Sequence, residues 1–317
     1  MQLPKRIPPV QPWDSLTSDQ KAYRSRVLQV YTAMVDNMDY NIGKVIKYLK
    51  DIGQYDNTLI IFASDNGSSE PIEAKNFITT GVTAAEQEAF VNKFNNSLPN
   101  IGNANSLVNY GAWGVAHSVS PLSYFKASQG EGGIRAPLII KLPGIVSNSN
   151  SSNNNNNNSS ANNQTSQTNN ILRAFVHVTD ITPTILEYAG VVQQQAGTTY
   201  KGMQVHPIMV KSIKPLLEDK VEKVHANDEA IAQEMFNNTA VFMGDWKAEK
   251  NQPPISDGKW YLFNITADVG ENTDLGSKYP DIIQKLISDY NKFAKDVGVV
   301  VPSGNAEAFE KIGEASD

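Results

Sequence analysis

The sequence predicts an α/β fold followed by a small α+β lobe at the carboxyl end. Three observations carry this prediction. Apolar residues recur at spacings of three and four between residues 27 and 49, as on one face of a long helix. Two short apolar, β-branched runs, residues 57–63 and 136–142, are typical of strands buried on both faces, as in a parallel sheet. After residue 240, short strand-like runs and one amphipathic helix follow each other.

The long helix follows a proline-rich stretch, residues 3–12, which should be an extended connector. Thr17 and Gln20 have the spacing of a capping box, so the helix should begin beside them. Gly53 is a plausible carboxyl-terminal stop. The apolar face is expected to contain Val27, Tyr31, Met34, Met38, Ile42, Val45 and Leu49.

Between the two predicted strands the pattern is irregular, with one short helix expected near residues 84–95. Residues 147–170 are almost entirely Asn, Ser, Gln and Thr, and they should form a disordered surface insertion, because they cannot bury apolar area. Residues 175–178 are a candidate strand. Residues 180–190 should form a helix with Pro183 in the first turn and Gly190 just past the end.

The lobe at the carboxyl end should contain strands at residues 240–243 and 260–264 and a helix at residues 280–297. We therefore divide the chain into an α/β domain, residues 1–235, and a small α+β subdomain, residues 236–317.

Composition excludes several classes of function. The chain has 317 residues, a formal net charge of -6 and no cysteine. A general nucleic-acid binder is disfavoured, since such proteins concentrate Lys and Arg against phosphates. Disulfides, thiolate zinc sites and cysteine nucleophiles are excluded for these residues. No apolar run approaches the roughly 20 residues that span a bilayer. The sequence does not indicate the cellular compartment of the protein.

Candidate site residues follow the first predicted strand. Asp65 and Asn66 offer a carboxylate and an amide carbonyl, which calcium and magnesium prefer as ligands, at the carboxyl end where open α/β sheets bind ligands. Lys126 precedes a Gly-Gly turn and could meet an anionic substrate, and His117 could be a minor substrate contact. The alternatives are an ordinary Asp-Asn-Gly turn, a solvated lysine and an ordinary loop histidine.

Other charged residues suggest structural roles. Glu131, Arg135 and Asp180 should form charge pairs that satisfy the backbone amides of buried turns, and a catalytic role is the less favoured alternative. His177 should be packed in an apolar strand, whereas His206 and His225 have no partner that the sequence reveals.

Read together and in order, these motifs resemble the sulfatases, and most closely the bacterial-type arylsulfatases. The resemblance covers nearly the whole chain apart from the Asn-rich tract. It rests on Ser64-Asp65-Asn66-Gly67, on Glu131-Gly132-Gly133-Ile134-Arg135-Ala136-Pro137, and on residues 12–17, 31–39, 42–43, 56–62, 101–106, 143–144, 178–183, 189–190, 244–247 and 270–275, with Lys126 between them.

The resemblance implies an alkaline-phosphatase-like mixed sheet flanked by helices and hydrolysis of small-molecule sulfate esters. It implies that Asp65 and Asn66 are metal ligands for Ca²⁺ (or Mg²⁺) and that Lys126 contacts sulfate. In the family a formylglycine, made from the Cys or Ser of a Cys/Ser-x-Pro-x-Arg motif, is the nucleophile.

These 317 residues contain no such motif. We therefore expect the formylglycine upstream of Met1, a fold that is incomplete at the amino terminus with a missing amino-terminal half as partner, and no activity of this chain alone. The alternatives are a non-catalytic remnant that binds a partner, or a phosphomonoester or phosphonate-ester hydrolase of the same superfamily.

Overall fold

A computed structural model describes residues 10–69, 83–144, 171–191, 199–204, 210–253 and 255–300. The chain divides into two compact units, and each is described by itself. Unit 1 consists of Met1–Asn41, Ala63–Pro137 and Asp228–Asp317, and unit 2 of Ile42–Phe62 and Leu138–Asn227. The expected insertion at residues 147–170 and His206 lie outside the described residues. The domain division at residue 235 stays a prediction.

The long helix α1 (Ser18–Asp51) follows a 3-10 turn, η1 (Trp13–Ser15). Its capping box is confirmed: the Thr17 amide donates to Gln20 Oε1 (2.9 Å), and the Gln20 amide donates to Thr17 Oγ1 (3.2 Å). Gly53, with φ of 68°, lies two residues past the end of the helix. A positive φ favours glycine, which explains why this local pattern predicted the stop.

Most of the predicted apolar face of α1 is open to solvent. Val27 is buried, but Met34, Met38 and Val45 are 61%, 46% and 60% exposed. Helical periodicity identifies the face, whereas its burial depends on what packs against it. The described part of the chain leaves this face largely uncovered.

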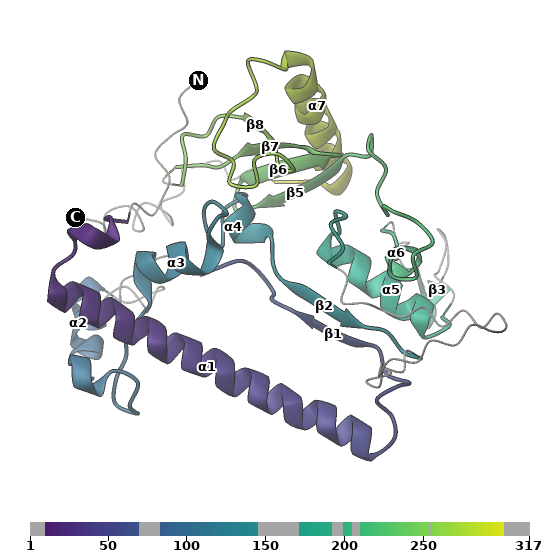
Figure 1. Ribbon diagram of the computed structural model, residues 1–317. Helices are drawn as coiled ribbons and strands as arrows, with labels where there is room; N and C mark the ends of the chain where they lie inside the picture. Colours follow the sequence, from purple (N-terminus) through teal and green to yellow (C-terminus); the bar gives the residue numbers. More distant parts are fainter. Residues whose placement is uncertain are drawn as a thin grey trace, which may run out of the picture. The chain divides into compact units, whose positions relative to one another are not determined.

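Strands β1 (Ile60–Ala63) and β2 (Leu138–Lys141) form a two-stranded sheet (Figure 1). Near one end the Ser64 amide donates to the Pro137 carbonyl, and near the other the Gly144 amide donates to the Asp56 carbonyl. The two strands therefore run antiparallel. The expectation of a parallel pair buried on both faces is wrong, and Ile139 is 64% exposed. Apolar β-branched residues favour a strand, but its direction and its burial are decided by its neighbours.

The rest of unit 2 consists of short elements. They are η4 (Val178–Asp180), α5 (Ile181–Tyr188), the hairpin of β3 (Thr199–Tyr200) with β4 (Met203–Gln204), and α6 (Lys214–Leu217). The predicted strand at residues 175–178 is wrong, because residues 175–177 are irregular and η4 begins at Val178. The predicted helix is confirmed, with Pro183 in the first turn of α5 and Gly190 beyond its end at φ of 71°.

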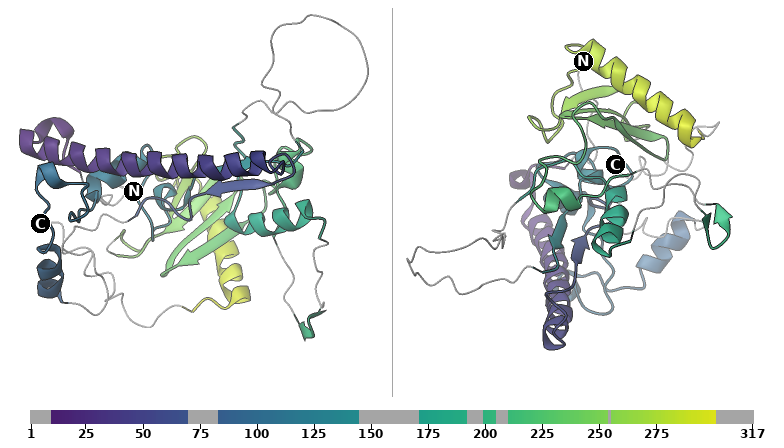
Figure 2. Two further views of the ribbon diagram at one scale, coloured as in Figure 1. Left: turned by 90° about the horizontal axis from the view of Figure 1, so that it is seen from below. Right: turned by 90° about the vertical axis from the view of Figure 1, so that its right-hand side faces the viewer.

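Unit 1 contains the helices α2 (Ala84–Val91), α3 (Gly111–Val119) and α4 (Glu131–Ile134) and a 3-10 turn, η3 (Leu98–Asn100). It also contains an antiparallel meander of β5 (Ile231–Met235), β6 (Asn238–Met243), β7 (Trp246–Lys250) and β8 (Tyr261–Asn264). Helix α7 (Pro280–Val297) lies across one face of this sheet (Figure 2).

The core of unit 1 joins the sheet to α7 through Val241, Ala248, Leu262, Leu286 and Tyr290. Ala248 faces Val241 on one neighbouring strand and Leu262 on the other, so three strands contribute to one apolar layer. The predicted helix at residues 280–297 is confirmed. Strands β5 and β7 were missed, because charged residues such as Lys247 and Glu249 interrupt the apolar pattern of β7.

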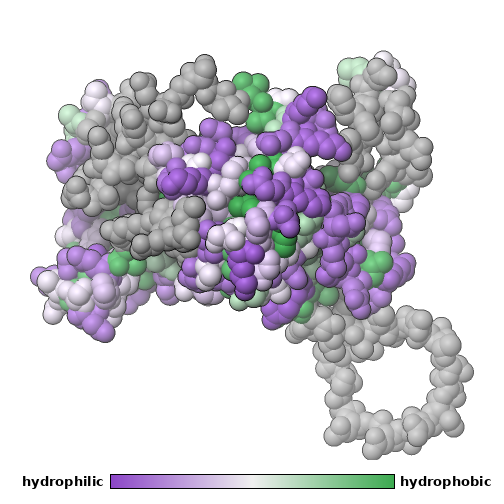
Figure 3. Space-filling model, turned by 90° about the horizontal axis from the view of Figure 1, so that it is seen from above, coloured by the Kyte–Doolittle hydropathy of each residue, from purple (hydrophilic) through white to green (hydrophobic). Residues whose placement is uncertain are grey.

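Two further observations concern the hydropathy of the surface and of the helices. Hydrophilic residues predominate on the face drawn in Figure 3, and hydrophobic residues are scattered among them. None of the described helices is both long and apolar enough to span a lipid bilayer.

Candidate functional site

Asp65 and Asn66 lie in the loop directly after β1, within unit 1. The Asp65 side chain is exposed and the Asn66 side chain is half-buried. The Ser64 hydroxyl donates to the Asn66 carbonyl (2.9 Å), which tightens the turn. The turn therefore leaves the carboxylate accessible to a cation or to solvent.

This loop is joined by backbone hydrogen bonds to the segment that contains Lys126. The Gly67 amide donates to the Gly133 carbonyl (2.8 Å), and the Lys126 amide donates to the Ser68 carbonyl (2.7 Å). The structure therefore brings the backbone of Lys126 beside the Asp65–Asn66 loop. The Lys126 side chain is exposed. A pocket shared by its ammonium and the Asp65 carboxylate stays a prediction.

Two glycines allow these segments to lie this close. A Cβ atom at Gly67 would lie 1.9 Å from the Gly132 carbonyl oxygen, and one at Gly132 would lie 2.6 Å from the carbonyl oxygens of both Ser123 and Tyr124. Real Cβ atoms do not approach a backbone oxygen so closely. From sequence, Asp-Asn-Gly and Gly-Gly indicated turns, and only the structure shows that these turns pack against each other.

A tyrosine supports the same loop from the start of α3. The Tyr110 hydroxyl lies 2.7 Å from Ser68 Oγ, and the Tyr110 ring stacks on Tyr31 with centroids 5.4 Å apart. His117 is exposed in the last turn of α3, about 10 Å along the helix from Tyr110. In the part of the chain that the structure describes, no hydrogen bond or ion pair joins His117 to residues 64–69, so its role stays a prediction.

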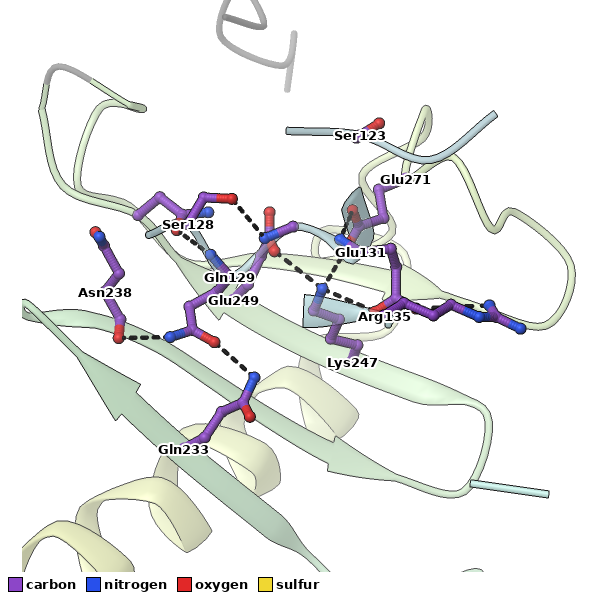
Figure 4. A network of polar contacts seen from close by, with 12 residues as sticks. Ser123, Ser128, Gln129, Glu131, Arg135, Gln233, Asn238, Lys247, Glu249 and Glu271 are labelled. Atoms are coloured by element: carbon purple, nitrogen blue, oxygen red, sulfur yellow. Dashed lines mark hydrogen bonds and ion pairs between the residues drawn. The ribbon is translucent and has the colours of Figure 1, made fainter. Parts of the chain in front are cut away.

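Behind the Gly-Gly turn lies a buried ion cluster, consisting of Lys247, Glu131, Glu249 and Glu271 (Figure 4). The Lys247 ammonium lies 2.5 Å from Glu271 Oε1, 3.1 Å from Glu131 Oε1 and 3.2 Å from Glu249 Oε2. None of the four residues is more than 4% exposed. The Arg135 guanidinium lies 3.6 Å from Glu131 and is half-exposed.

Charge and burial shift the pKa values in this cluster. Burial, reinforced by the neighbouring Glu249, raises the pKa of Glu271 to about 8. Burial alone would lower the pKa of Lys247, but the carboxylates of Glu271, Glu249 and Glu131 outweigh it and raise that pKa. The structural role expected for Glu131 is confirmed. Lys247 and Glu271 were missed as its partners, although Lys247 and Glu249 have the period-two spacing that puts both on one face of a strand.

A contact between a histidine and a buried carboxyl group lies in unit 2. His225 Nε2 is 2.8 Å from Asp180 Oδ2, the same oxygen that accepts the His177 amide at 2.8 Å. Asp180 is fully buried, so its expected structural role is confirmed. The sequence revealed no partner for His225, because residues 45 positions apart in the chain come together only in the fold. His177 caps η4 and does not lie in a strand.

The donor set of Asp65 and Asn66 suits a hard divalent cation, but it fills only part of a coordination sphere. Calcium takes about 6 to 8 oxygen ligands. Among the described residues, no group of three or more His, Cys, Asp or Glu side chains could hold a metal ion. These two residues could therefore supply two ligands of a calcium or magnesium site.

The described fold is similar to that of a solved protein structure. The crystal structure of Ps i-CgsB in complex with k-i-k-neocarrahexaose matches 95% of this chain and 48% of its own, with a TM-score of 0.53 at 21% identity. This likeness confirms the predicted α/β fold class.

Sequence comparison shows the family. Residues 4–191 match the family model described as Sulfatase. An uncharacterised sulfatase of Schizosaccharomyces pombe is 33% identical over 290 residues, covering 91% of this chain and 47% of its own length. An arylsulfatase of Klebsiella aerogenes is 31% identical over 180 residues, covering 56% of this chain and 33% of its own. This chain belongs to the sulfatase family, and it spans about half the length, or less, of these curated relatives.

Proposed function

We propose that this protein is a sulfuric ester hydrolase of the arylsulfatase type, which converts a sulfate ester and water into an alcohol or phenol and sulfate. One observation carries the proposal: in a chain of the sulfatase family, the Asp65–Asn66 loop and the backbone of Lys126 are hydrogen-bonded neighbours. The similarity to the arylsulfatase of Klebsiella aerogenes supports the arylsulfatase type.

In this proposal Asp65 and Asn66 hold Ca²⁺ or Mg²⁺ through their side-chain oxygens, and the Lys126 ammonium contacts the sulfate. A divalent cation would offset the negative charge that accumulates on the sulfate oxygens during ester cleavage. Lys126 adds a second positive charge from the neighbouring loop. Because Asp65 and Lys126 are both exposed, an anionic substrate can reach them from solvent.

The nucleophile is not among these 317 residues, which contain neither a cysteine nor a Ser-x-Pro-x-Arg motif. We infer that the formylglycine comes from a segment outside them, because positioned cations alone bind a sulfate without forming the covalent intermediate. The same absence favours a second candidate function, a sulfatase-like chain that binds sulfate or a partner without turnover. A formylglycine motif read in frame upstream of Met1 would decide for the enzyme.

The purified 317-residue chain should bind calcium weakly, with a dissociation constant of about 10⁻⁴ M or higher, because water must complete most of the coordination sphere. Asp65→Ala should abolish this binding in titration calorimetry. Asp36→Ala, which removes an exposed carboxylate from α1 in the same unit, should leave it unchanged. Neither protein should hydrolyse 4-nitrophenyl sulfate.

Two outcomes would contradict this assignment. Calcium binding by Asp65→Ala equal to that of the unmodified chain would remove Asp65 from the metal site. Hydrolysis of the ester by the unmodified chain, lost in Asp65→Ala, would show that the nucleophile lies within these residues after all.

The exposed face of α1 supports the proposal of a further segment as partner. Met34, Met38, Val45 and Tyr48 are each 46% to 61% exposed. Large contiguous apolar patches are uncommon on monomeric soluble proteins. The purified chain should therefore self-associate in size-exclusion chromatography with light scattering, and replacing Met34, Met38 and Val45 by Gln should shift it toward monomer. A monodisperse monomer of the unmodified chain at high concentration would count against a missing partner.

A further inference from the structure

Residues 123–137 form a platform between the candidate metal loop and the buried ion cluster, all within unit 1. On one side the platform binds the loop, through the Gly133 carbonyl to the Gly67 amide and through the Lys126 amide to the Ser68 carbonyl. Charged groups from β7 and from the loop after β8 also bind the platform, at Glu131. The position of the loop therefore depends on how the platform is held.

Glu271 and the preceding Gly270 bind the platform at two places. Glu271 Oε2 accepts a hydrogen bond from the Glu131 amide at 2.9 Å, and the Gly270 carbonyl accepts one from the Ser123 hydroxyl. Glu271 Oε1 accepts a hydrogen bond from the Lys247 ammonium, which also donates to Glu131 Oε1 at 3.1 Å. Both side-chain oxygens of Glu271 are thus used, one by the backbone and one by Lys247.

The cluster contains more negative than positive charge. Three carboxyl groups surround one buried ammonium, and the guanidinium of Arg135 is 51% exposed, so it compensates only in part. Glu249 Oε2 lies 3.2 Å from the ammonium but receives no hydrogen bond from the described residues. Because uncompensated buried charge is strongly unfavourable, the cluster favours a proton on Glu271, whose pKa is raised by burial and by the neighbouring Glu249.

We propose that Glu271 and Lys247 are positioning residues for the Asp65–Asn66 loop, acting through the Glu131–Gly133 turn. The proposal rests on the proposed function only in taking this loop as the metal site. Neither residue touches the metal or the substrate. Their effect is to keep the turn, and with it the Gly133 carbonyl that binds Gly67, in one place.

The proton on Glu271 makes this positioning dependent on pH. The pKa of Glu271 is about 8 in the folded cluster, raised from an ordinary value of 4.5. We call the cluster closed when its four residues are in contact and buried, and open when Glu271 is exposed to solvent. A raised carboxyl pKa stabilises the closed cluster fully below pH 4.5, and this stabilisation is lost progressively as pH rises to about 8. Above about pH 8 both closed and open forms have lost the proton, so no further change arises from this group.

Hydrogen exchange of the full chain, measured between pH 5 and pH 9 and corrected for the intrinsic rate, tests the proposal without any metal. Protection of peptides covering residues 64–69 and 123–135 should fall by up to about tenfold per pH unit toward pH 8 and then level off. Glu249→Gln removes the extra carboxylate without removing volume, so it should flatten this profile and increase protection at pH 8. Glu88→Gln, an exposed residue of α2, is the matched control and should leave the profile unchanged.

The outcomes separate this proposal from the proposed function. A pH profile of residues 64–69 that is flat, or that is identical in the chain with Glu249→Gln, would overturn the positioning role. The proposed function fails separately, if Asp65→Ala leaves calcium binding intact while the exchange profile behaves as expected. Should Glu249→Gln not fold, Arg135→Gln gives the second measurement: removing positive charge should extend the decline to higher pH without changing its limiting slope.

Discussion

Replacing Lys247 by methionine should lower the free energy of unfolding by about 3–5 kcal/mol, because it leaves three carboxyl groups buried together without their counter-charge. Lys247 is fully buried, and its ammonium lies within 3.2 Å of all three. Methionine has a similar length and packs well in apolar surroundings, so lost charge rather than lost volume dominates. Denaturant unfolding followed by tryptophan fluorescence measures the change.

Two further variants identify the cause. Lys292→Met removes an exposed ammonium from α7 and should change stability by no more than about 0.5 kcal/mol. Combining Lys247→Met with Glu249→Gln should restore part of the loss, because one fewer negative charge is buried. If Lys247→Met were as stable as the unmodified chain, the buried ion cluster could not be what holds residues 123–137 in place.

Replacing Gly67 by alanine should destabilise unit 1 by about 1–3 kcal/mol and displace the candidate metal loop. The added Cβ would lie 1.9 Å from the Gly132 carbonyl oxygen and 2.8 Å from the Gly133 carbonyl carbon. Both neighbours are backbone atoms, so no side chain can rotate away, and the hydrogen bond from the Gly67 amide to Gly133 must lengthen. Thermal unfolding and calcium titration of the same protein measure both effects.

Gly43→Ala is the contrasting control, since the same atom is added where it meets nothing within 4 Å. Gly43 lies inside α1, where alanine is favoured over glycine by about 0.5–1 kcal/mol. Its stability should therefore rise while that of Gly67→Ala falls. Loss of calcium binding in Gly43→Ala as well would mean that the loop responds to general changes in the chain.

Local patterns in the sequence were sufficient for the elements whose formation is itself local. The capping box at Thr17, the stop at Gly53 and the amphipathic helix from Pro280 to Val297 depend on residues within a few positions of one another. Strands were predicted less well. Strand β7 was missed because Lys247 and Glu249 face a buried charge partner instead of solvent, which no alternation of apolar residues reveals.

For the candidate site, too, some features follow from the sequence and others only from the fold. The sequence by itself determined which residues have the right chemistry: Asp65 and Asn66 as oxygen donors after a strand, and Lys126 as a cation ahead of a Gly-Gly turn. The tertiary structure alone decided that Gly67 packs on Gly132, that the Lys126 amide binds Ser68, and that Glu271 joins Glu131 across 140 residues. It also decided that β2 runs antiparallel to β1 and that His225 pairs with Asp180. The physical reason is that oxygen donors, caps and helical periodicity are properties of neighbouring residues, whereas close backbone approach and buried charge pairing depend on which distant segments the fold brings together.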